Sequence, residues 1–136
     1  SNVVPQEARI VIDARSENRD LMDEFLALLD RETRAFASDS RTERAVFARL
    51  SDTNPTACDA RLRGLLRDSA NALGFTSTDI ASGAGHDAAF VARIAPSAML
   101  FIPCRDGKSH APEEWAEPDA LAAGTAVIAE AVLRFD

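Results

Sequence analysis

Two histidines are the residues of this sequence whose surroundings point most directly to chemistry. His86 ends a loop of small residues, SGAGHD at positions 82–87, directly before an apolar stretch that is typical of a helix. Glycines let the backbone approach a ligand closely, and N–H groups at a helix start favour an anionic or carbonyl oxygen. His86 is therefore a candidate for bonding or protonating a substrate group. The alternative is a tight turn in which His86 only caps the helix.

His110 is the second candidate and lies in the segment SHAPEEW, residues 109–115. An apolar run that predicts a buried strand, residues 98–102, precedes it. Ligands of α/β sheets gather beyond the carboxyl ends of strands, so an imidazole there is well placed to bind a metal. A zinc site needs three or four protein ligands, however. In isolation, a surface histidine beside acids explains this segment better.

Asn2 and Arg15 form a third candidate, at the two ends of the first segment. The planar guanidinium of arginine binds a carboxylate through two hydrogen bonds, and an amide can donate or accept beside it. This pair alone is weak evidence for a carboxylate site. An arginine at a strand end is more often solvated or paired with a neighbouring acid such as Asp13.

Alternation and helical periodicity predict the elements that must position these residues. Residues 8–15 are β-branched at their centre and alternate at their flanks, which predicts a strand. An amphipathic helix is expected over residues 17–36, with Ser16 as its N-cap. A second strand follows over residues 43–50, and the turn-forming residues 51–56 mark a change of domain.

The second half predicts mainly helices. Apolar spacing favours a helix over residues 59–73 that ends at Gly74, and another over 88–94. The last helix begins at Pro118, and the strand at 98–102 lies between this helix and the one at 88–94. Neither half closes a sheet alone, and a sheet of one or two strands is marginal. We therefore expect each half to need strands from sequence outside this chain.

Composition excludes several classes of partner. The 136 residues carry a formal charge of −7, with the basic residues scattered among the acids, so nucleic acid is not an expected partner. The apolar runs are far shorter than the roughly 20 residues of a membrane span. Two cysteines are too few for a disulfide framework, which makes the cytoplasm the expected location. The abrupt start, without Met or a leader, leads us to expect an upstream portion.

Three motifs together resemble one enzyme family. NVVPxxAxxxxDxR at residues 2–15, SGAGHDA at 82–88 and SHxPEEW at 109–115 follow one another over essentially the whole chain. In this order they resemble the M20-type zinc amidohydrolases, in the branch of N-carbamoyl-L-amino acid hydrolase, β-ureidopropionase and allantoate amidohydrolase. The GAGHD motif is the branch-specific part. Gln6 in place of glycine and Lys108 in place of an apolar residue are the two departures, and Lys108 leaves the substrate class open.

The resemblance implies an α/β (α+β) architecture with two domains. Residues 1–54 would form half of a ferredoxin-like lid, which also makes a homodimer. Residues 55–136 would form the last part of an α/β catalytic domain, whose earlier part holds the other metal ligands and the general base. The chain would thus be the C-terminal portion of the enzyme. It would bind no metal and have no activity on its own, whereas the complete enzyme would hold Zn²⁺ or Mn²⁺.

The resemblance also implies roles for five residues. His110 looks like one metal ligand, Asn2 and Arg15 look like lid residues that bind a substrate carboxylate, and His86 with Gly85 looks like a pair that binds substrate and stabilises the transition state.

The implied reaction is hydrolysis of linear ureido or amide C–N bonds in N-carbamoyl amino acids or allantoate-like substrates. The substrate would be a small molecule with a carboxylate. Two other hypotheses remain open: a non-catalytic dimerising or interaction module derived from the family, and an M20-type exopeptidase.

Overall fold

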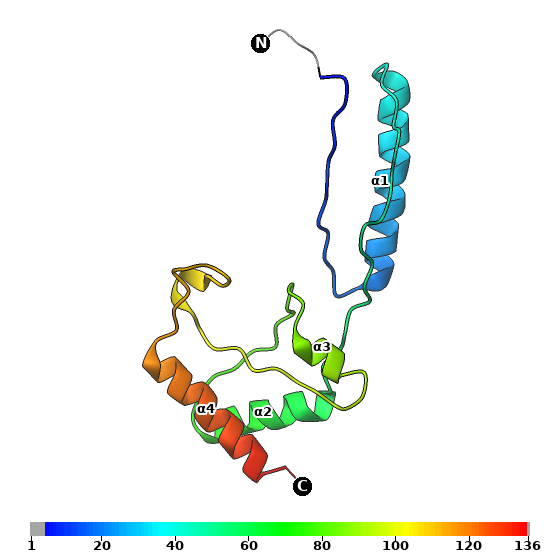
Figure 1. Ribbon diagram of the computed structural model, residues 1–136. Helices are drawn as coiled ribbons and strands as arrows, with labels where there is room; N and C mark the ends of the chain where they lie inside the picture. The colour runs from blue at the N-terminus through cyan, green and yellow to red at the C-terminus, as the bar shows by residue number, and fades with distance from the viewer. Residues whose placement is uncertain (1–4, 136) are drawn as a thin grey trace. The chain divides into compact units, whose positions relative to one another are not determined.

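The computed structural model describes residues 5–135 of the chain, which divides into two compact units, Ser1–Pro55 and Thr56–Asp136. Each unit is described by itself. The helices in the described range are α1 (Arg19–Asp39), α2 (Ala60–Ala72), α3 (Asp87–Val91) and α4 (Pro118–Leu133), with a short 3₁₀ helix, η1, at Arg105–Gly107 (Figure 1). None of the helices found in this range is long and apolar enough to cross a membrane.

Helix α1 dominates the first unit and begins two residues later than the sequence predicts. Its N-cap is Asn18, whose side-chain oxygen accepts a hydrogen bond from the Leu21 N–H at 3.1 Å. Ser16 was the wrong choice of cap, because its hydroxyl oxygen instead accepts from the Asn18 N–H at 3.0 Å. Asparagine and serine are equally favoured at N-caps, so residue type could not rank them.

The structure corrects the prediction of three strands. Residues 8–15, 43–50 and 98–102 run as open chain, and no residue between 5 and 135 belongs to a hydrogen-bonded strand (Figure 1). A strand is completed by hydrogen bonds to a neighbouring backbone, which β-propensity alone does not supply. The described chain is α-rich, and the α/β class is not observed in it.

Ion pairs join the second open segment of the first unit to α1. The Arg44 guanidinium bonds the Asp30 carboxylate at 2.6 Å and lies over the Phe47 ring. Near the start of the helix, Arg19 bonds Asp52 at 3.1 Å. Because Arg44 is mostly buried, this attachment holds the segment along the helix without any fully buried apolar side chain in α1.

Helices α2 and α4 pack against each other and form the core of the second unit. Its buried apolar residues are Ala70, Val127 and Ala131. Gly124 in α4 lies so close to the open segment 98–102 that a Cβ there would stand 2.6 Å from Cγ2 of Ile102. A glycine is thus the residue that lets this helix approach the segment.

Both predicted helix signals of the second unit are confirmed. Gly74 follows the end of α2 with φ +78°, and the Phe75 N–H donates to the Ala70 carbonyl at 2.9 Å, which is the Schellman pattern. Pro118 is the first residue of α4. Helix α3 covers Asp87–Val91 and is therefore shorter than the predicted 88–94.

Much apolar surface stays exposed. The chain exposes 11345 Å², whereas a compact monomer of this mass exposes about 6900 Å². An interface between two domains of one chain removes only about 600–1500 Å². Large side chains such as Ile10, Ile94 and Leu133 are each more than four-fifths exposed. Each unit, taken by itself, therefore leaves large apolar side chains exposed among its described residues.

One such face is an open apolar groove of about 410 Å³ in the second unit. It lies on α2, α4 and the open segment before Phe101. Its lining residues are Leu62, Leu65, Leu66, Ala98, Leu100, Ile128, Ala131, Val132 and Phe135.

Candidate functional site

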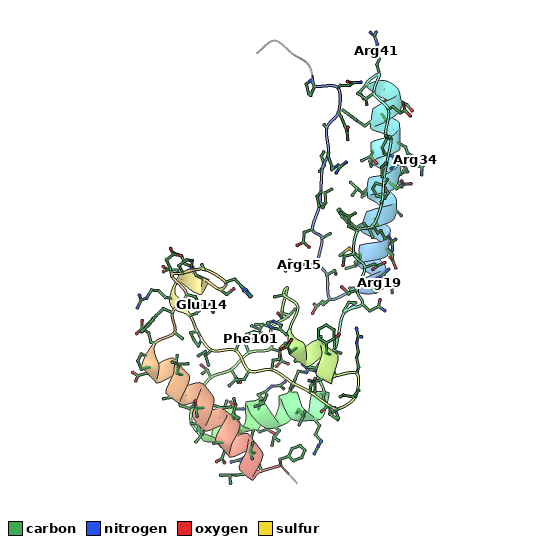
Figure 2. The ribbon with its side chains drawn as sticks, viewed as in Figure 1. Arg15, Arg19, Arg34, Arg41, Phe101 and Glu114 are labelled. Carbon is green, nitrogen blue, oxygen red and sulfur yellow. The ribbon has the colours of Figure 1, made fainter. Side chains whose placement is uncertain are left out.

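The imidazole of His86 is held by two contacts. Its Nε2 lies 2.7 Å from the Ser82 hydroxyl oxygen, which also accepts a hydrogen bond from the Ala84 N–H at 3.2 Å. The ring of Phe101 meets the imidazole edge-on, with centroids 5.6 Å apart and planes at 62°. His86 is half-buried between them. The loop before α3 and the open segment around Phe101, which Figure 2 labels, thus meet at this histidine.

His86 occupies the N-cap position of α3, but its side chain makes no capping hydrogen bond. Only its carbonyl serves the helix, accepting from the Ala89 N–H at 2.9 Å. The alternative in which the histidine is a simple cap therefore explains the backbone and not the imidazole. Because α3 has only five residues, the contacts to Ser82 and Phe101 define this site better than the helix start does.

Gly85 lies directly before His86 and has space around it. A Cβ built on Gly85 would meet no atom within 4 Å, and its N–H has no hydrogen bond to another described residue. An amide donor thus stands next to an imidazole that can also donate. The joint role that the family resemblance implies for residues 85 and 86 stays a prediction.

His110 lies in a separate loop with unusual backbone geometry. Its φ is 55°, in the left-handed region, and its N–H donates to the Glu114 carboxylate at 2.9 Å. The Arg105 N–H closes the loop by donating to the Trp115 carbonyl at 2.7 Å. Left-handed non-glycine residues cost about 1–3 kcal/mol and are concentrated at functional sites. The loop therefore holds an exposed imidazole in a defined, strained position.

The loop does not assemble a metal site from the described residues. Between positions 5 and 135, no group of three or more His, Cys, Asp or Glu side chains is placed to hold a metal ion. His110 and His86 also share no hydrogen bond or ring contact. The described residues therefore do not give His110 a complete set of companion ligands for a metal ion.

Arg15 belongs to the first unit and is paired with Asp13. Its Nη2 lies 2.6 Å from Asp13 Oδ2, and its Nε lies 3.1 Å from Oδ1, so two N–H groups along one edge of the guanidinium bond the carboxylate. This hydrogen bonding lowers the pKa of Asp13 below its ordinary value. The residue ends the first open segment just before α1 (Figure 2). This pair is the alternative to substrate binding that the sequence predicts for Arg15.

An open hollow of about 270 Å³ lies beside Arg15. Its other lining residues are Ala14, Ser16, Leu21, Met22 and Phe25. Asn2, the predicted partner of Arg15, lies outside the described residues.

Sequence reasoning missed Ser82 and Phe101. Ser82 stands four residues before His86 in the same motif, so its hydroxyl was a detectable signal. Phe101 belongs to an apolar run that indicated only a strand. Nothing local in the sequence relates Phe101 to the loop, because their contact depends on how the second unit folds.

The comparisons with known proteins agree with the motifs. Residues 4–134 match the family described as Peptidase family M20/M25/M40. The chain is 36% identical over 139 residues to the N-carbamoyl-L-amino-acid amidohydrolase of Paenarthrobacter aurescens, covering 99% of this chain and 32% of that protein. It is 29% identical over 138 residues to the allantoate amidohydrolase of Bacillus subtilis (strain 168), covering 98% and 32%.

A solved structure supports the same relationship. A crystal structure of an amidohydrolase/peptidase from Burkholderia cenocepacia superposes with a TM-score of 0.79 at 37% identity, covering 87% of this chain and 29% of that one. The chain thus spans about a third of the length of the curated relatives it matches. The predicted resemblance to the M20-type amidohydrolases is confirmed.

Proposed function

Because the chain belongs to the peptidase family M20/M25/M40, we propose that it is the C-terminal portion of a metal-dependent amidohydrolase. The substrates we propose are N-carbamoyl amino acids or allantoate-like molecules. The relatives named for these substrates support this choice. Since the chain spans about a third of their length, the activity belongs to the complete polypeptide. This chain by itself is expected to be inactive.

The observation that carries the proposal is the half-buried His86 next to the open N–H of Gly85. Hydrolysis of an amide or ureido carbon passes through a tetrahedral species whose oxygen carries negative charge. Donors held in place before the reaction stabilise that charge, and losing one typically costs about 10²- to 10³-fold in kcat. The Ser82 and Phe101 contacts support this role, because they hold the imidazole in place.

Arg15 is proposed to bind the substrate carboxylate, together with Asn2. Arg15 presents two N–H groups along one edge of its guanidinium, now bonded to Asp13, and this geometry also suits a carboxylate of a ligand. Substrate binding would then exchange one carboxylate for another. The first unit would act as the lid and as the contact of a cytoplasmic homodimer.

His110 is proposed as one ligand of a divalent metal, Zn²⁺ or Mn²⁺, in the complete polypeptide. The residues described for this chain do not fit a whole metal site, since no group of three ligands exists among them. We therefore derive no reaction step through the metal. The strained, exposed imidazole of His110 is what supports its role as a ligand.

The test is a substrate comparison with the complete polypeptide, loaded with Zn²⁺ or Mn²⁺. N-carbamoyl-L-amino acids, allantoate and dipeptides are supplied separately, and product release is measured for each. Hydrolysis of a carbamoyl or allantoate substrate supports the proposal. Cleavage of dipeptides alone would identify an exopeptidase instead, and no hydrolysis of any substrate would favour an interaction module.

Two variants then assign the residues. His86→Ala should lower kcat about 10²- to 10³-fold with little change in KM. Arg15→Lys should mainly raise KM, because an ammonium cannot form the paired hydrogen bonds that a guanidinium makes to a carboxylate. Arg9→Lys is the matched control, since Arg9 is an exposed arginine of the same segment with an acidic neighbour, Glu7. Equal effects of the Arg9 and Arg15 variants would remove Arg15 from the site.

A further inference from the structure

We propose that Ser82 is a positioning residue that keeps the proton of neutral His86 on Nδ1, while Phe101 holds the ring in its orientation. This inference rests on the proposed function in one respect, namely that His86 serves the reaction as a hydrogen-bond donor. It concerns which nitrogen of the ring donates.

The hydroxyl of Ser82 has one hydrogen and two acceptors within reach. The acceptors are Nε2 of His86 at 2.7 Å and the Ala84 carbonyl at 3.4 Å. The first distance is ordinary for a hydroxyl donor, whereas the second is beyond the usual range. The Ser82 oxygen already accepts from the Ala84 N–H. These distances favour donation from the hydroxyl to Nε2, which then carries no proton.

A neutral imidazole with an unprotonated Nε2 carries its hydrogen on Nδ1. The helix cap agrees with this tautomer. At an N-cap, a side-chain acceptor would take a hydrogen bond from the first turn of the helix, and His86 makes no such bond. A protonated Nδ1 can only donate, so it cannot accept a hydrogen bond from the N–H groups of the helix. It remains available to a ligand oxygen near the Gly85 N–H.

Phe101 restricts the other freedom of the ring, which is rotation about its bond to Cβ. The T-shaped contact, with ring centroids 5.6 Å apart, limits that rotation, because such aromatic pairs have a preferred geometry. Ser82 at one nitrogen and Phe101 against the ring together specify both the tautomer and the orientation. The outcome is a donor that is arranged before substrate arrives.

Imidazole nitrogen NMR on the complete polypeptide tests the inference without any activity measurement. His86→Gln assigns the His86 ring through the loss of its signals. In the wild type, the neutral ring of His86 should show a protonated Nδ1 and an unprotonated Nε2. Ser82→Ala should move most of the population to the Nε2 tautomer.

Two further variants separate the hydroxyl from general disturbance of the fold. Ser82→Thr keeps the hydroxyl and should keep the wild-type tautomer. Ser97→Ala removes another serine hydroxyl of the same unit, one that donates to the Ala88 carbonyl at 3.1 Å and not to a ring. It should also leave His86 unchanged. A wild-type His86 with its proton on Nε2, or an unchanged tautomer in Ser82→Ala, would overturn the proposal.

Kinetics of the complete polypeptide then connect the tautomer with the reaction. Ser82→Ala should lower kcat about fivefold to tenfold, the equivalent of one ordinary hydrogen bond, with KM within about twofold. Ser82→Thr should restore most of the rate. If the NMR result holds but carbamoyl and allantoate substrates are not hydrolysed, the proposed function fails and the positioning of His86 stands. If the NMR result is absent, this inference fails whatever the activity.

Discussion

Replacing Gly124 by alanine tests the closest packing contact of the second unit. The new Cβ would lie 2.6 Å from Cγ2 of Ile102 and 3.5 Å from Cδ2 of Leu100. A methyl of a β-branched residue sits close to its own backbone and moves little. Helix α4 or the open segment 98–102 must therefore shift to admit the methyl group.

Two effects of opposite sign determine how Gly124→Ala changes the free energy of unfolding. Overpacking of a buried contact costs about 1–3 kcal/mol. Alanine in place of glycine inside a helix stabilises by about 1 kcal/mol. The free energy of unfolding is therefore expected to fall by about 0–2 kcal/mol. Gly64→Ala in α2 is the matched control, because nothing lies within 4 Å of its Cβ position, and it should stabilise by about 1 kcal/mol.

The assay is thermal and urea unfolding followed by circular dichroism. For a unit of this size, 1 kcal/mol corresponds to about 4–8 °C in Tm, so the two variants should move Tm in opposite directions or differ by several degrees. Ile102→Ala removes the obstructing methyl, and in that background Gly124→Ala should lose its extra cost. If Gly124→Ala stabilises as much as Gly64→Ala, the close approach of α4 to the segment is refuted.

Two further predictions concern the first unit. Hydrogen bonds from Arg19 and Arg49 lower the pKa of Asp52 to about 2. Because the folded pKa is depressed, the stabilisation is present above the unfolded pKa of about 3.9 and is lost as pH falls towards about 2. Urea midpoints across that range should fall less in Asp52→Asn than in the wild type, and equal slopes would contradict this. Asp13→Asn should remove one carboxylate that competes for the Arg15 guanidinium and lower KM for a carboxylate substrate about two- to fivefold in the complete polypeptide; initial-rate kinetics check this, and a raised KM would show that Asp13 supports the site.

The helices could be predicted from the sequence because their signals are local. The apolar spacing of α1, the glycine after α2 and the proline that starts α4 act within a few residues of each other. The error at the start of α1 is also local. Ser16 and Asn18 are both good caps, and the choice depended on which side chain reaches the Leu21 N–H.

The predicted strands were wrong for this chain because a strand is a property of a pair. Residues 8–15, 43–50 and 98–102 have the composition of strands, yet none has a backbone partner in the described range. In the second unit, α4 and the close approach at Gly124 cover one side of residues 98–102. Ile94 and Phe101 nevertheless stay exposed, so packing against one helix does not bury all the apolar side chains in and near this segment.

The sequence by itself determined the family, the helices and the two histidine motifs, since motif order and helical periodicity can be read along the chain. Tertiary structure alone decided that Phe101 lies against His86. Phe101 reaches the ring only because the chain folds back after α3, whereas Ser82 lies four residues from His86 in the same motif. Such contacts depend on distance in space, and distance in space is set by packing that no local pattern encodes.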